Sequence, residues 1–131
     1  MFAIIVFTSC KKYEDGPLIS LRSKTNRFTG MWSVNEIYYN NQKSNNTFNY
    51  TYIFRRDGTC EFSSVNPVIG IVNNRAGAWV FSNNKTDVDI FWTSGGTNEH
   101  INYKILRLKY SELWLFSNQY NDMQEMHLLR K

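Results

Sequence analysis

The sequence predicts an all-β protein, most simply an eight-stranded antiparallel up-and-down β-barrel, with a two-layer β-sandwich as the alternative. Apolar and polar side chains alternate through much of the chain after Gly30, which is the period of a half-buried strand. Turn-forming pairs, Asp57-Gly58, Asn83-Asn84 and Gly95-Gly96, recur between these runs. No helical pattern long enough to cover a sheet separates them, and closure into a barrel would remove the exposed sheet edges.

The expected strands follow one another in chain order. The second shows the clearest alternation, because every other residue from Phe48 to Phe54 is aromatic. Asp57-Gly58 then predicts a type I′ hairpin turn, whose two residues must tolerate positive φ. In the sixth strand the apolar positions change phase, which predicts a β-bulge near Ile105. An asparagine-rich loop is expected at Asn40–Asn46, and the eight strands are expected at about Met31–Tyr39, Phe48–Arg55, Thr59–Val65, Arg75–Ser82, Asp87–Trp92, Ile101–Leu108, Leu113–Leu115 and Met123–Arg130.

Length and composition indicate one globular domain. The 131 residues suffice for a single core, and the chain is 42% hydrophobic and 16% aromatic, which excludes a disordered chain. Its 15 basic and 11 acidic residues give a net charge of +4, a mild excess that does not point to nucleic acid.

The N-terminal part differs from the rest. An apolar run from Met1 to Phe7 precedes Cys10 and is too short to span a bilayer. Phe7-Thr8-Ser9-Cys10 resembles the lipobox of bacterial lipoproteins, which implies removal of residues 1–9, diacylglycerol on Cys10 and attachment to the outer membrane of the cell envelope through acyl chains. The basic region that usually opens such a signal is missing, so we expect the signal to be truncated and the true start to lie upstream. The other interpretation is a buried first strand that ends in cysteine.

Residues 10–29 are expected to form a lipidated tether. Gly16-Pro17 breaks regular structure, and a short helical turn starting at Pro17 is one option within it. Its basic residues could touch acidic headgroups or simply stay solvated. Residues 30–131 are expected to form the barrel domain.

A second resemblance supports the barrel. Gly30-Met31-Trp32 is similar to the Gly-x-Trp motif of lipocalins, which are eight-stranded barrels. The resemblance implies that Trp32 packs across the closed end of the barrel against Arg130 near the end of the last strand. The chain from about residue 28 to 130 also resembles lipocalin-like lipoproteins of Gram-negative envelopes. This resemblance rests on Gly77-x-Trp79-x-Phe81, Tyr103-Lys104-Ile105 and Leu113-x-Leu115.

Catalytic and metal-binding patterns are not expected, and neither is a cofactor. His100, His127 and Cys60 lack the short paired spacings of metal sites, and Cys60 is expected to be a lone buried thiol. Asp87 and Asp89 share a strand face opposite the apolar residues, so we expect solvated surface there rather than an acid-base pair.

Two functions from different classes remain. In the first, the barrel mouth binds a small apolar or aromatic-stacking ligand such as a lipid or sugar. Glu36 shares the phase of Trp32, so it is expected either inside the barrel beside a partner or at the rim, where water reaches it. The candidate ligand-binding residues are Glu36, Tyr38, Phe48, Tyr50, Tyr52 and Trp92. In the second, a barrel filled by side chains is a structural or interaction lipoprotein that docks on another envelope protein.

Overall fold

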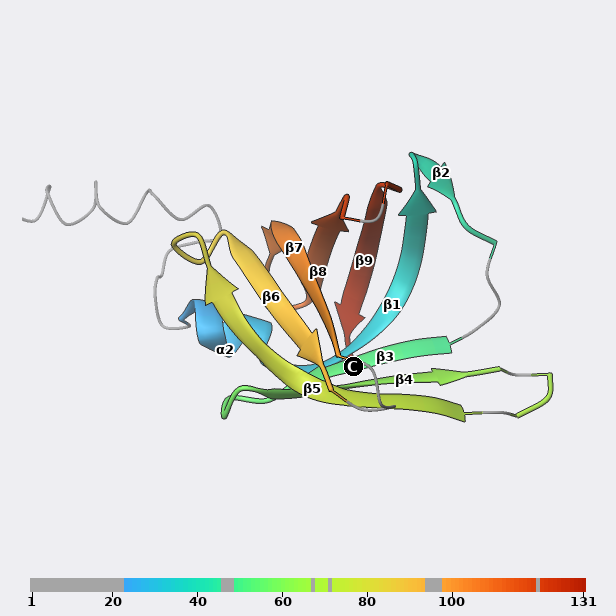
Figure 1. Cartoon of the computed structure of the whole chain (residues 1–131), viewed down its shortest axis with the longest axis horizontal. Helices are drawn as coiled ribbons and strands as arrows, with labels where there is room; N and C mark the ends of the chain where they lie inside the picture. The colour runs from blue at the N-terminus through green and yellow to red at the C-terminus, as the bar shows by residue number, and fades with distance from the viewer. Residues whose placement is uncertain (1–22, 46–48, 67, 71, 94–97, 120) are drawn as a thin grey trace, which may run out of the picture.

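The computed structural model describes residues 23–45, 49–66, 68–70, 72–93, 98–119 and 121–131. It confirms the predicted fold: a closed eight-stranded antiparallel β-barrel with one extra short strand (Figure 1). The elements are α2 (Lys24–Phe28), β1 (Gly30–Tyr39), β2 (Gln42–Lys43), β3 (Asn49–Phe54), β4 (Thr59–Val65), β5 (Val72–Ser82), β6 (Asp87–Trp92), β7 (Glu99–Leu108), β8 (Glu112–Ser117) and β9 (Gln124–Arg130).

The barrel closes where the first long strand meets the last. β1 pairs with β3 on one side and with β9 on the other, from Trp32 opposite Arg130 to Tyr39 opposite Gln124. Consecutive strands pair all the way round from β3 to β9. A two-layer sandwich, in which the first and last strands would lie apart, is therefore excluded.

The turns differ in part from those expected. Asp57-Gly58 does connect β3 to β4, but the predicted type I′ turn is wrong, because Gly58 (φ 93°) has positive φ and Asp57 does not. The Arg55 N–H donates to the Thr59 carbonyl at 2.9 Å, so the loop between the two strands holds three residues. A loop of this length needs the left-handed conformation only at its last residue, Gly58. Asn40 (φ 51°) and Asn41 (φ 69°) instead form a turn that leads into β2, a strand that the sequence pattern did not predict.

Two β-bulges set which residues face inward. The bulge predicted near Ile105 is confirmed as a register shift between Ile105 and Arg107. A second one, which was not predicted, lies in β1 between Val34 and Glu36. Because side chains alternate along a strand, this extra residue reverses the phase of the second half of β1.

One end of the barrel is capped by α2 and by three turns, at residues 55–58, 83–86 and 109–111; we call it the closed end (Figure 1). Phe28 of α2 is fully buried there, with its ring centroid 4.4 Å from that of Phe54 and 4.9 Å from that of Trp79. The prediction that residues 10–29 are a tether is therefore wrong for residues 23–29, which belong to the domain. Residues 1–22, including Cys10 and the apolar run, lie outside the described residues.

The resemblance implied a contact between Trp32 and Arg130, and this contact is present. The guanidinium of Arg130 lies 4.5 Å from the centroid of the Trp32 ring. The Trp32 indole N–H donates to the Phe28 carbonyl at 2.9 Å, which ties α2 to the barrel wall. The buried apolar side chains that fill the barrel are those of Phe28, Trp32, Ile37, Tyr52, Phe54, Cys60, Trp79, Val88, Ile90, Trp92, Tyr103, Leu108, Leu113, Leu115, Met126 and Leu128.

Candidate functional site at the open end of the barrel

The end opposite α2, where β1, β4, β6 and β8 finish, is here called the mouth. An ion pair lies on its inner wall and bridges two strands: Nη1 of Arg75 on β5 lies 2.8 Å from Oε1 of Glu99 on β7. The two side chains are 29% and 32% exposed, respectively. The guanidinium also lies 5.2 Å from the ring centroid of Trp92, which is on the intervening strand β6. A planar guanidinium above an indole face is a favourable cation–π geometry.

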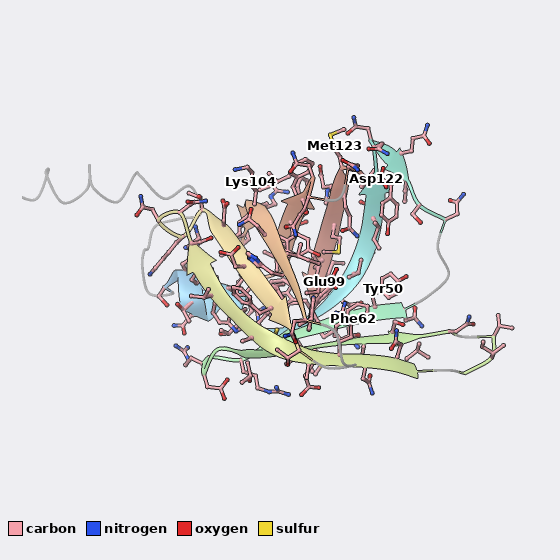
Figure 2. The ribbon with its side chains drawn as sticks, viewed as in Figure 1. Tyr50, Phe62, Glu99, Lys104, Asp122 and Met123 are labelled. Atoms are coloured by element: carbon pink, nitrogen blue, oxygen red, sulfur yellow. The ribbon has the colours of Figure 1, made fainter. Side chains whose placement is uncertain are left out.

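Aromatic rings line the wall beside this ion pair. The ring centroid of Phe62 lies 5.5 Å from that of Tyr50, 5.0 Å from that of Tyr52 and 6.3 Å from that of Trp92. Tyr50 and Phe62 are only partly buried, whereas Tyr52 and Trp92 are buried. Figure 2 shows Tyr50, Phe62 and Glu99 gathered near one another inside the barrel beside β3 and β4.

Below these rings the interior is filled. The Tyr52 hydroxyl lies 3.8 Å from Sδ of Met126, and Tyr103 is buried beside it. Burial raises the pKa of Tyr52 well above its usual value, and the neighbouring Tyr103 raises it further. The phenol is therefore a neutral hydrogen-bonding group at physiological pH. A ligand that entered the mouth would rest on this floor rather than pass through the barrel.

Three of the six predicted ligand-binding residues, Tyr50, Tyr52 and Trp92, lie at the mouth, and Phe48 lies outside the described residues. The prediction that Glu36 and Tyr38 point inward is wrong. Glu36 pairs with His127, which lies on β9 between the inward-facing Met126 and Leu128. The bulge between Val34 and Glu36 is the physical reason, because the extra residue turns both side chains to the outer face.

On the outer face Glu36 is part of a charged cluster. Its two carboxylate oxygens lie 3.1 Å from Nδ1 of His127 and 3.2 Å from Nζ of Lys43. The other imidazole nitrogen of His127 lies 2.6 Å from Oε2 of Glu125, and the Tyr38 hydroxyl donates to Glu36 at 3.3 Å. The hydrogen bond from Lys43, followed by that from His127, lowers the pKa of Glu36. This cluster joins β1, β2 and β9 at the seam where the barrel closes.

Phe62, Arg75 and Glu99 also lie at the mouth, although the sequence pattern did not predict them as site residues. A signal for each was present in the alternation. Arg75 lies two residues before Gly77 and shares the inward phase of Trp79, and Glu99 lies two residues before Ile101. The hairpin at residues 55–58 also sets Phe62 directly opposite Tyr52. Because charged side chains usually face water, the alternation alone does not identify Arg75 and Glu99 as inward-facing.

The other candidate groups stay separate from the mouth. Cys60 is a free thiol that is 1% exposed, as expected. Asp87 and Asp89 lie on the outer face as predicted, but Asp87 is only 2% exposed and accepts hydrogen bonds from Asn83 Nδ2 at 2.8 Å and Thr86 Oγ1 at 3.0 Å. The expectation of solvated surface is therefore wrong for Asp87. Within the described ranges, no three His, Cys, Asp or Glu side chains are grouped so that they could hold a metal ion.

Comparison with models of known protein families found no match for this chain, and comparison with curated proteins found none either. None of the helices that the structure describes is long and apolar enough to cross a membrane. The molecule is thus defined here by its fold, a closed antiparallel β-barrel, and by the groups at its mouth.

Proposed function

We propose that this protein is a membrane-anchored, lipocalin-like lipoprotein that binds a small ligand at the mouth of its barrel. The ligand would have a planar or apolar part and one polar or acidic group. The observation that carries the proposal is the Arg75–Glu99 ion pair, held over Trp92 inside the barrel among partly exposed aromatic rings.

An ion pair inside a barrel needs a reason beyond stability. Taking two charges partly out of water is costly, and apolar residues of similar size often stabilise such a position as well or better. Aromatic walls with a few polar groups are typical of small-molecule sites, where the rings supply contact area and the polar groups fix orientation. The fork of donors on Arg75 suits an acidic or carbonyl group of a ligand that stacks on Phe62 or Tyr50.

The anchor is a separate part of the proposal and rests on Phe7-Thr8-Ser9-Cys10. Two or three acyl chains would hold the domain on a bilayer without any protein contact. Expression of the protein from its own gene, followed by mass spectrometry of the N-terminal peptide, should find diacylglycerol on Cys10. Cys10→Ser should release the protein from the membrane fraction, and an unmodified Cys10 would contradict the anchor.

The filled-barrel function remains the second candidate. It is favoured by the packing below the mouth, where Tyr52, Met126 and Tyr103 are buried and the side chains of Trp32 and Leu113 fill the barrel beneath them. In that case the barrel would dock on another envelope protein through its outer face or loops. The two candidates differ in whether the mouth takes up a small molecule.

Titration with 1-anilinonaphthalene-8-sulfonate, an aromatic anion, distinguishes them. We expect saturable binding, with about fivefold weaker affinity in Phe62→Ala and in Arg75→Gln, because each loses an interaction of about 1 kcal/mol. The matched control is Phe91→Ala, whose ring lies on the outer face of β6, where it stacks on His100. Loss of affinity in the control alone, or no saturable binding, would favour the filled-barrel function.

A further inference from the structure

The closed end carries a ring of basic side chains. Besides Arg55, which is paired with Glu61, each of the three turns that surround α2 contributes one exposed basic residue: Arg56, Lys85 and Lys109. The first two turns approach α2 closely, since Arg56 donates a hydrogen bond to the Asn26 side chain and Lys85 lies with Thr25 around a shared hollow. The third turn follows Leu108, whose carbonyl accepts a hydrogen bond from the Arg27 guanidinium at 3.2 Å.

That hollow lies between α2 and the turns at residues 55–58 and 83–86. It is open to solvent and has a volume of about 610 Å³. Arg56 and Lys85 stand among its lining residues, and Trp79, Val80 and Phe81 supply an apolar wall. Cationic groups beside apolar side chains are the combination that suits the interface between phospholipid headgroups and acyl chains.

The carboxylates near this end, Asp57, Glu61, Asp87 and Glu112, all have hydrogen-bonding or ionic partners, and Asp57 is the one acidic group among the lining residues of the hollow. Asp57 accepts hydrogen bonds from the Thr59 N–H at 2.9 Å and the Thr59 hydroxyl at 2.7 Å. Glu61 is paired with Arg55, and Glu112 lies 3.3 Å from Arg107. At the opposite end, the described turns carry Asp122. Lys43 lies beside these turns and is paired with Glu36. The barrel is thus positively polarised toward α2.

The chain also enters the domain at the closed end. Ser23, the N-cap of α2, lies there, and Cys10 precedes it by 13 residues. Thirteen residues span roughly 45 Å at most. A lipid on Cys10 would therefore keep this end, with its basic ring, within reach of the bilayer surface.

We propose that the closed end is a membrane-facing surface that binds anionic phospholipid headgroups, with Arg56 and Lys85 around the headgroup phosphate and Lys109 beside them. This inference rests on the proposed function for the orientation of the barrel, in which the mouth faces away from the bilayer. The basic ring itself does not depend on the modification of Cys10.

The test uses the full chain with Cys10→Ser, so that no acyl chain contributes. Flotation is measured with vesicles of neutral phosphatidylcholine and with vesicles that contain about one-third phosphatidylglycerol. Binding to the neutral vesicles measures any contribution from the apolar N-terminal residues. We expect preferential binding to the anionic vesicles, about thirtyfold weaker in Arg56→Gln/Lys85→Gln, since each basic residue near the surface contributes about fivefold.

The matched control is Lys43→Gln/Asn121→Asp, which makes the same change in net charge at exposed positions near the mouth and should retain binding. Arg56→Lys/Lys85→Arg keeps the charge and should also retain it, and thermal melting checks that every variant folds. The inference would be overturned by an equal loss in the control pair and in Arg56→Gln/Lys85→Gln, by undiminished binding in the closed-end pair, or by no preference for anionic vesicles. Failure here is separable from failure of the proposed function, because dye binding at the mouth and lipid on Cys10 are measured without vesicles.

Discussion

The indole of Trp114 and the imidazole of His127 are stacked, with ring centroids 3.9 Å apart and planes 9° from parallel. The two residues are direct partners across β8 and β9, and each has a further partner on the next strand. The Arg107 guanidinium lies 4.6 Å from the Trp114 ring, and Glu36 lies opposite His127. These four residues form a continuous row on the outer face of β7, β8, β9 and β1. The row crosses the seam that closes the barrel.

This stack should contribute measurably to stability. A double-mutant cycle with Trp114→Leu and His127→Leu is expected to give a coupling free energy of about 0.5–1.5 kcal/mol from chemical denaturation. The control cycle uses Phe91 and His100, which stack at 4.4 Å and 12°. Because the His100 side chain is 52% exposed and that of His127 only 14%, the control coupling should be smaller. A coupling as large in the control would contradict the role given to the seam.

Glu36 should make stability depend on pH. Hydrogen bonds from Lys43 and His127 lower its pKa in the folded state, so its contribution is fully present above the unfolded pKa, about 4.3. The contribution is lost as the pH falls through the lower folded pKa. Glu36→Gln should therefore lower the Tm at pH 7, and the difference from the unmodified protein should shrink below about pH 4. Melting curves from pH 3 to 7 check this, and a constant difference over that range would count against it.

Arg130 should be among the most sensitive residues at the closed end. Its guanidinium donates to the carbonyls of Thr29 at 2.9 Å, Arg27 at 2.6 Å and Tyr110 at 2.5 Å while it covers Trp32. Arg130→Met leaves these carbonyls without their donor and should cost about 2–4 kcal/mol of unfolding free energy.

Arg130→Lys should recover little of this loss, since an ammonium group has no planar fork of donors. Arg55→Met is the control, because Arg55 is exposed and its ion pair is with the exposed Glu61, so its loss should cost far less than that of Arg130. Urea denaturation measures all three variants. Similar losses in Arg130→Met and Arg55→Met would refute the role of Arg130 in holding α2.

Cys60 should be unreactive in the native protein. Burial raises the pKa of its thiol to about 12, so almost no thiolate is present at pH 8. In the Cys10→Ser background, an aromatic disulfide reagent at pH 8 should modify Cys60 only as fast as the barrel opens, and rapidly in denaturant. Complete modification of the native protein within seconds would show that the thiol is not enclosed as the structure describes.

Much of the fold follows from alternation alone. The period of two from Phe48 to Phe54 and from Val88 to Trp92 identifies strands whose two faces differ, and the phase change near Ile105 identifies a bulge. The β1 bulge had no such signal. The residues of β1 fit an inward or an outward phase equally well, as Val34, Ile37 and Tyr38 show. Only the pairing with β9 therefore decides which face of the strand Glu36 takes.

The site was less predictable for a related reason. Phe28 is one apolar residue in a polar stretch, and its burial depends on contacts with Phe54 and Trp79, which are distant in sequence. Arg75 and Glu99 are ordinary charged residues until β5, β6 and β7 lie side by side. Local patterns report which face a residue takes, whereas a site depends on which strands become neighbours.

Binding at the mouth can be tested most directly with the four indole N–H groups of the protein, on Trp32, Trp79, Trp92 and Trp114. Trp92 lies at the mouth, Trp32 and Trp79 donate to the Phe28 and Arg55 carbonyls near the closed end, and Trp114 lies on the outer face. In a ¹⁵N-labelled Cys10→Ser chain titrated with the naphthalene sulfonate dye, we expect the Trp92 signal to move at low ligand ratios while that of Trp114 stays in place. A stationary Trp92 signal at saturation, with shifts confined to the other three indoles, would contradict a ligand site at the mouth.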